Sequence, residues 1–282
     1  MKIRFGHSPD PDDAFMFYAI ARNKIWCDPF VIDHVIEEIE TLNQRARKGE
    51  LEVTAISMHA YAYCAEKYRL LSCGASIGDG YGPILVSKKA MRPDALKGKR
   101  IAIPGKLTTA YLVLQLFGDG FIEEFLPFDE IVPAVESGKA DLGLLIHEGQ
   151  LTYEESGFQK IVDLGVWWKK KTGLPLPLGV DVIRKDIPEE IAESFDTLFR
   201  KCIQYSLDHR DEAIEYALTF GRGLEKKKAD RFIGMYVNQD TLDYGEKGKE
   251  AIRKLFSEAE RKNLIPTGVV PEFVDEGVLS RR

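Results

Sequence analysis

Short apolar stretches alternate with amphipathic ones along the first two thirds of this chain. Lys2–Gly6 alternates apolar and polar residues as a strand does, and residues 12–22 follow with the apolar spacing of a helix. Further strands are predicted at residues 31–38, 52–57, 70–76, 83–88, 100–104, 140–146 and 160–165, and helices at 41–49, 58–64, 108–117 and 129–137. An extended return is predicted over residues 172–184, and residues 186–262 read almost wholly as helix. Strands that alternate with helices indicate an α/β fold.

Two of the predicted helices begin with a capping signal. Thr41 and Gln44 have the spacing of a capping box, and Gly49 is suited to end the helix that follows. Asp186 and Glu189 repeat that spacing before the long helical part of the chain. We therefore expect helices to open at these two places.

The order of the elements predicts two domains. Residues 1–90 and 180–282 are expected to form a discontinuous first domain, with residues 91–179 inserted as the second. Two crossings between the domains would make a hinge over a central cleft. Clefts between domains are common small-molecule sites, and their closure excludes water.

The apolar run of residues 140–146 ends abruptly on His147, Glu148 and Gly149. Ligands in open α/β sheets lie beyond the carboxyl ends of the strands, and an imidazole can accept a proton near neutral pH. His147 is therefore our leading candidate for a catalytic base. The alternative is a hydrogen-bonded structural histidine at the end of a strand.

Other candidate binding residues follow predicted strands. Ser57 ends one strand and opens a helix, where it either binds an anionic group or acts as a simple N-cap. Thr108, Thr109 and Ala110 open the helix after the strand that ends at Pro104, and they suit a carboxylate or hydroxyl groups. Asn43 begins a helix and either reaches a ligand or lies on the surface.

The sequence does not predict a metal or cofactor site. Asp10, Asp12 and Asp13 lie among prolines before a helix, which favours turn and capping roles over metal binding. The histidines lack the spacing of metal ligands, and His59 is expected to be structural. The four cysteines form no Cys-x-x-Cys pair and are expected to be reduced and mostly buried.

Composition narrows the class of partner. The 282 residues are 44% hydrophobic and carry a net charge of −6, which disfavours a general nucleic-acid binder. No segment has the roughly 18 consecutive apolar residues of a membrane helix, and the N-terminus lacks the apolar core of a signal peptide. We expect a cytoplasmic protein that does not bind membranes, either a monomer or a homodimer.

Four segments together resemble the 1,4-dihydroxy-6-naphthoate synthase family of menaquinone biosynthesis. They are residues 8–18, 101–110, 146–149 and 163–168, the last followed by Thr172–Gly179. The similarity covers most of the first 185 residues in the expected order. It implies a two-domain fold like that of the type II periplasmic solute-binding proteins, used as an enzyme.

The resemblance also implies a reaction and a set of residues. The family cleaves cyclic dehypoxanthine futalosine, a step of the futalosine pathway, as a carbon–carbon lyase that needs no cofactor. Its proton acceptor falls on His147, and its substrate contacts fall on Ser57, Thr109 and Ala110, with Asn43 a weaker correspondence. The expected partner is a small anionic substrate.

One motif departs from the family, and two alternative functions stay open. The family often opens with Ser-Pro-Cys-Pro-Asn-Asp-Thr-Phe, whereas this chain has Asp10, Asp12 and Ala14 at the corresponding places. The changes add acidic residues and leave room for a related substrate. The alternatives are a chorismate dehydratase-like enzyme of the same pathway and a non-enzymatic binding protein.

Overall fold

The computed structural model describes residues 1–147, 149–220 and 224–274, and within them the strands form two separate sheets. The first sheet has the order β2-β1-β3-β11-β4, and β5 also pairs with β11. Its strands are β1 (Lys2–His7), β2 (Val31–Ile36), β3 (Val53–Ser57), β4 (Tyr68–Leu70), β5 (Ser76–Gly78) and β11 (Leu176–Arg184). β1 is parallel to β2 and β3, whereas β11 runs antiparallel to β3, β4 and β5.

The second sheet has the order β10-β6-β9-β7-β8. Its strands are β6 (Ile84–Ser87), β7 (Arg100–Ile103), β8 (Ile122–Phe125), β9 (Leu142–Leu145) and β10 (Gln159–Asp163). β7 is parallel to both β8 and β9, so the carboxyl ends of β7 and β9 lie at the same edge. All four residues of β9 are buried, as expected for a continuous apolar strand inside a sheet.

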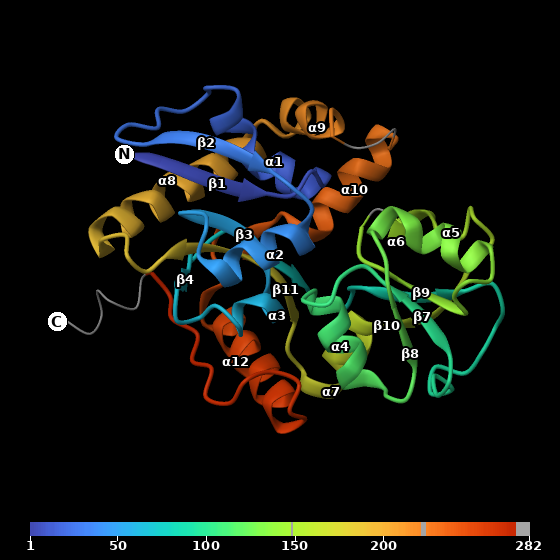
Figure 1. The fold of residues 1–282 in the computed structure, drawn as a ribbon. Coiled ribbons are helices and arrows are strands. Elements are labelled where there is room, and N and C mark those ends of the chain that lie inside the picture. The colour runs from blue at the N-terminus through green and yellow to red at the C-terminus, as the bar shows by residue number, and fades with distance from the viewer. Residues whose placement is uncertain (148, 221–223, 275–282) are drawn as a thin grey trace.

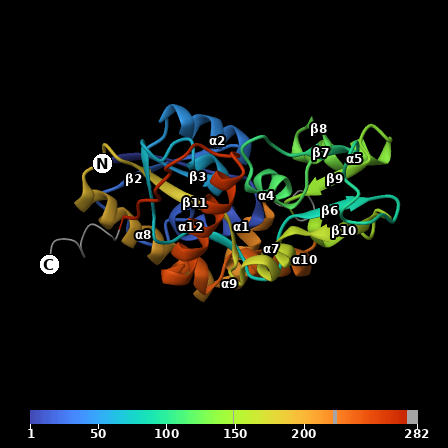
Figure 2. The ribbon, with the colours of Figure 1, turned by 90° about the horizontal axis from the view of Figure 1, so that it is seen from below.

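Helices pack on both sheets and join them. They are α1 (Pro11–Ala21), α2 (Ile39–Lys48), α3 (Met58–Tyr61), α4 (Thr109–Phe117), α5 (Ile131–Glu136), α6 (Gly149–Thr152), α7 (Leu164–Thr172), α8 (Glu189–Asp208), α9 (Arg210–Leu218), α10 (Lys226–Tyr236), α11 (Gln239–Leu242) and α12 (Gly245–Arg261), with a 3-10 turn at Phe128–Glu130. The first sheet with α1, α8, α9 and α12 makes one lobe and the second sheet with α5 and α6 makes the other (Figure 1). Figure 2 shows the two lobes side by side along the length of the molecule.

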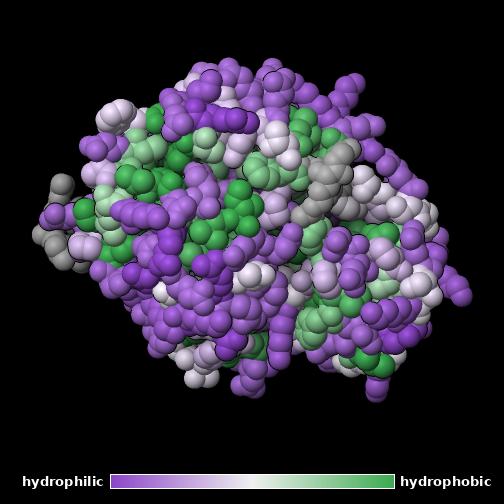
Figure 3. Space-filling view, turned by 45° about the horizontal axis from the view of Figure 1, so that its top comes forward, coloured by the Kyte–Doolittle hydropathy of each residue, from purple (hydrophilic) through white to green (hydrophobic). Residues whose placement is uncertain are grey.

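Two large apolar clusters hold these lobes. Phe5 and Phe17 meet Phe199 where α1 and α8 cover the first sheet. The second cluster contains buried residues from both sheets, including Trp168 of α7 and Leu176 of β11. The lobes therefore share a continuous core on one side. On the face drawn in Figure 3, hydrophilic residues cover much of the surface, and apolar residues show as patches between them.

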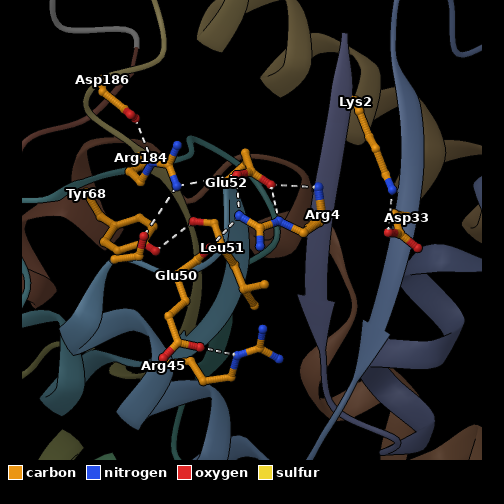
Figure 4. Close-up of polar contacts among 11 residues, drawn as sticks. Lys2, Arg4, Asp33, Arg45, Glu50, Leu51, Glu52, Tyr68, Arg184 and Asp186 are labelled. Carbon is orange, nitrogen blue, oxygen red and sulfur yellow. Dashed lines mark hydrogen bonds and ion pairs between the residues drawn. The ribbon is translucent and has the colours of Figure 1, made fainter.

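An ion-pair cluster ties three strand segments of the first sheet together. Arg4 of β1 donates hydrogen bonds from Nε and Nη2 to the carboxylate of Glu52, at 2.8 and 2.6 Å. Arg184 at the end of β11 also donates to Glu52, at 3.3 Å (Figure 4). These contacts hold the pKa of Glu52 at about 2, chiefly through the hydrogen bond from Arg4.

Both capping-box predictions are wrong. α2 begins at Ile39, so Thr41 lies inside its first turn, although Gly49 ends the helix in the left-handed region as expected. α8 begins at Glu189 without a side-chain cap, because the carboxylate of Asp186 pairs instead with Arg184, at 2.7 Å. In neither place does the predicted residue cap the helix.

The domain boundaries at residues 90 and 180 stay a prediction. The sheets themselves place β6 in the second sheet and β11 in the first, from Leu176 onward. The sequence reading also missed β8, whose side chains are mostly exposed, and α7, which is capped by Asp163. Three of the four cysteines are buried and all are free. No helix in the described part of the chain is both long and apolar enough to cross a membrane.

Candidate active site

A pocket of about 110 Å³ lies where carboxyl ends of strands from the two sheets face each other. Asp10 follows β1 and Ser57 ends β3, while Thr108 follows β7 and His147 follows β9. The lining residues are Ser8, Asp10, Asp12, Asp13, Ile39, Ser57, Ser76, Pro83, Thr108, Thr109, Ala110, Ile146, His147, Gln150, Leu178, Gly179, Phe232 and Tyr236. The pocket occupies the position at which α/β sheets usually hold ligands.

A larger groove of about 770 Å³ adjoins this pocket. The two share Ile39, Ile146 and His147 as lining residues. Lys106 and Phe128 belong to the groove. His147 therefore lies at the junction between the pocket and the groove.

His147 is buried and held from two sides. It is 8% exposed, and its Nδ1 lies 3.1 Å from Oδ2 of Asp10. The ring of Phe128 packs edge-on against it, with centroids 4.3 Å apart. Glu148, the next residue, lies outside the described residues. The geometry suits an imidazole kept in one orientation beside a ligand pocket.

Three aspartates crowd the pocket near His147. Burial raises the pKa of Asp13 to about 6, and the charge of Asp10 adds to this shift. Burial and the neighbouring carboxyl of Asp13 raise the pKa of Asp12 well above its ordinary value. These two side chains hold protons more readily than surface aspartates do, so the pocket is less negative than the sequence suggests.

The predicted capping role is wrong for the side chain of Asp10. Asp10 occupies the N-cap position of α1 but makes no side-chain cap bond. Its carboxylate instead accepts from Oγ of Ser8, at 2.9 Å, and faces His147. Asp13 accepts from the Ser8 amide, at 2.9 Å. Within the described residues, no group of three or more His, Cys, Asp or Glu is placed to hold a metal ion.

The start of α4 presents amide groups to the pocket. Thr108 caps the helix, because its Oγ1 accepts from the amide of Tyr111. Thr109 donates its hydroxyl to the carbonyl of Leu178, at 2.6 Å. With both hydroxyls engaged, the first-turn N–H groups of Thr109 and Ala110 are what the helix offers a ligand.

Ser57 lines the pocket, whereas Asn43 lies behind it. Asn43 is fully buried and is not among the pocket-lining residues. Its Oδ1 accepts from the Ser57 amide at 2.8 Å, and its Nδ2 donates to the Ser57 hydroxyl at 3.1 Å. Ser57 makes no side-chain cap bond to α3. Asn43 thus fixes the position of Ser57.

His59 connects the two lobes without lining the pocket. Its amide donates to Oγ1 of Thr109, and its Nδ1 lies 3.2 Å from the carbonyl oxygen of Thr108. Burial lowers its pKa to about 4. These contacts agree with the structural role that the sequence suggested for it.

Sequence reasoning missed the pocket residues Gln150 and Tyr236. The Tyr236 hydroxyl donates to Oε1 of Gln150, at 3.0 Å. Among the residues described, Nε2 of Gln150 is buried with no hydrogen-bond partner, so it is available to a ligand acceptor. Gln150 comes three residues after His147, and its place beyond the same strand could have indicated it as a pocket residue. Tyr236 comes from the distant α10 and gave no local signal.

The comparisons with known proteins bear on this arrangement. Residues 3–261 match a protein family described as menaquinone biosynthesis. The chain belongs to that family. It is 39% identical to a Thermus thermophilus protein named 1,4-dihydroxy-6-naphtoate synthase, over 96% of this chain and 99% of the relative. A Streptomyces coelicolor protein of the same name is 34% identical, over 94% and 95%.

Solved structures agree on the fold. A crystal structure of an Archaeoglobus fulgidus protein is 50% identical, with a TM-score of 0.90 over 94% of this chain and 98% of that one. A Candida albicans protein described as having the generic periplasmic binding protein fold is 15% identical, with a TM-score of 0.66 over 94% and 95%. The family resemblance and the periplasmic-binding-protein-like α/β fold are therefore confirmed.

Proposed function

We propose that this protein is a 1,4-dihydroxy-6-naphthoate synthase that cleaves cyclic dehypoxanthine futalosine without a cofactor. The names of its Thermus and Streptomyces relatives support the product and the pathway. The observation that carries the proposal is the placement of His147. It is buried at the junction of pocket and groove, with its Nδ1 next to the carboxylate of Asp10.

In this proposal His147 is the general base. It removes a proton from the sugar-derived part of the substrate, which starts an elimination or retro-aldol-like fragmentation. The electron pair left by that proton forms a new π bond in the sugar-derived fragment. The bond between this fragment and the ring system breaks, and its electron pair moves into the ring system, which becomes aromatic. Burial of the base excludes water and strengthens its electrostatic contacts with the substrate.

The start of α4 is suited to the carboxylate that the product's name implies. A helix N-terminus favours negative charge, and α4 offers the amides of Thr109 and Ala110. Ser57, at the end of β3, also lines the pocket. In the adjoining groove, Lys106 adds a positive charge. These groups would hold the substrate and stabilise negative charge during fragmentation.

The test is turnover of cyclic dehypoxanthine futalosine by the wild type, His147→Ala and His209→Ala, followed by chromatography and mass spectrometry. His209 is exposed and stacks on Tyr205 away from the pocket, so its variant controls for loss of a histidine. Removing a general base costs about 10²–10⁴-fold, so His147→Ala should nearly abolish product while His209→Ala keeps the wild-type rate.

Near-normal turnover by a folded His147→Ala protein would contradict the assignment of the base. Absence of product from the wild type would refute the synthase proposal. Thermal unfolding of each variant separates lost chemistry from lost structure.

A further inference from the structure

We propose that Asp10 is a positioning residue that fixes the ring orientation and tautomer of His147. The inference rests on the proposed role of His147 as the base. Oδ2 of Asp10 lies 3.1 Å from Nδ1 of His147, and the two residues are 7% and 8% exposed. At this distance Nδ1 of His147 is within hydrogen-bonding range of the carboxylate, and a hydrogen bond between an imidazole and an ionised carboxylate is charge-assisted.

The surroundings of Asp10 hold its carboxylate in place. Ser8 Oγ donates to the same oxygen that faces His147, at 2.9 Å, and accepts from the Asp10 amide, at 3.1 Å. Pro9 and Pro11 restrict the backbone on either side. The N-cap position leaves the carboxylate free of any side-chain cap bond to α1. The segment is thus built to direct this carboxylate at His147.

The chemistry of the pair selects one tautomer. An ionised carboxylate only accepts hydrogen bonds, so Nδ1 of His147 must carry the proton. The basic lone pair is then on Nε2. The same carboxylate stabilises the imidazolium that forms when the base takes up a proton. Asp10 therefore acts on the reaction through His147.

The pair also spans the two lobes. Asp10 follows β1 of the first sheet, and His147 follows β9 of the second. Two further contacts cross the same gap: Glu40 accepts from the amide of Leu107 at 3.0 Å, and Gln150 accepts from Tyr236. The two members of the pair are therefore supplied by different lobes.

Other charged groups face His147 as well. Asp12 and Asp13 of α1 both interact electrostatically with it, and burial raises the pKa of each. Of these aspartates, Asp10 is the one whose carboxylate makes the close contact with Nδ1. In the described part of the chain, the groove adds the distant charges of Glu38, Glu40, Lys106 and Asp129. An Asp10 variant is therefore expected to change the electrostatics at His147 more than loss of any other charge here.

The test compares the wild type with Asp10→Asn, His147→Ala and the double variant. Asn keeps the shape of Asp but removes the charge and allows an amide N–H to face Nδ1. We expect kcat to fall by about 10²–10⁴-fold, the range for a general base in the wrong tautomer. Asp10→Asn should add little to His147→Ala, because the two residues act as a unit. Asp211→Asn, an exposed aspartate of a helical first turn, is the matched control.

Two readouts separate positioning from a structural role. Loss of the carboxylate disfavours the imidazolium, so the acid limb of the kcat/KM profile should move to lower pH in Asp10→Asn. Nitrogen-15 NMR of labelled histidine, assigned with His147→Ala, should show the proton on Nδ1 in the free wild type. It should show a changed tautomer or a weakened hydrogen bond in Asp10→Asn.

The outcomes distinguish this inference from the proposed function. An active wild type with an unchanged rate, pH profile and tautomer in Asp10→Asn would overturn the positioning role alone. A proton on Nε2 of His147 in the free wild type would overturn it too. An inactive wild type would refute the proposed function, and the NMR measurement would still show whether Asp10 sets the tautomer.

Discussion

Asp181 lies in the middle of β11 and is 1% exposed. Neither of its carboxylate oxygens has a hydrogen-bond partner among the described residues. Burial raises the pKa of this carboxyl well above 3.8, and the charge of Asp13 adds to the shift. Folding therefore takes up a proton at Asp181 at pH values between the unfolded pKa and the folded pKa of this carboxyl.

This uptake makes the free energy of unfolding fall as pH rises. Between the unfolded pKa of 3.8 and the folded pKa, the free energy of unfolding falls by about 1 kcal/mol for each pH unit. Asp181→Asn keeps a neutral polar group of the same shape and removes the titration. As the pH rises from about 4, the free energy of unfolding of the variant should increase relative to that of the wild type by the same amount per pH unit.

Urea unfolding of both proteins at a series of pH values from 4 to 8 measures this difference. Asp196→Asn is the control, because Asp196 is a buried aspartate that accepts from the amide and hydroxyl of Ser72, at 2.7 and 2.5 Å. That variant should be destabilised, by about 1–3 kcal/mol. A stability difference between Asp181→Asn and the wild type that does not change with pH would refute the reasoning.

Two further predictions concern backbone packing and acid stability. A Cβ at Gly165 would lie 1.9 Å from the backbone oxygen of Tyr81, so Gly165→Ala should lower the free energy of unfolding by about 1–3 kcal/mol. At Gly234 the nearest atom to a Cβ is a side-chain nitrogen of Arg210 at 3.2 Å, so Gly234→Ala should raise the free energy of unfolding by up to about 1 kcal/mol. Equal melting temperatures for the two variants would contradict this. Arg4 holds the pKa of Glu52 at about 2. The stabilisation that this ion pair gives the folded state is therefore fully present above pH 4.5 and is lost as the pH falls through 2. Glu52→Gln should therefore cost about 1 kcal/mol at pH 7 and nothing near pH 2 in urea unfolding, and an equal cost at both pH values would count against the ion pair.

Several elements were predictable because their signals are local. β1 and β3 follow from their apolar positions, and Gly49 ends α2 because glycine adopts the left-handed conformation without a steric cost. His147 was found because a buried strand has to end where its apolar run ends. The pocket-lining positions of Ser57 and Thr109 were suggested by the same rule.

Other features had no local signal. β8 lies at the edge of its sheet with mostly exposed side chains, so its apolar pattern is weak. Asp186 has the spacing of a cap, but Arg184 provides a stronger partner for its carboxylate. Tyr236 reaches the pocket only because α10 packs against it.

The sequence by itself determined the α/β class, the alternation of most strands and helices, and His147 as the leading candidate for a catalytic base. The hydrophobic period and the end of a strand are properties of neighbouring residues, so they can be read locally. Only the tertiary structure decided that β6 pairs in the second sheet and that Asp10 meets His147. It also decided that the hydroxyl of Thr109 donates to the carbonyl of Leu178. Such partners are far apart in the chain, so burial and hydrogen-bond competition in the folded molecule select them.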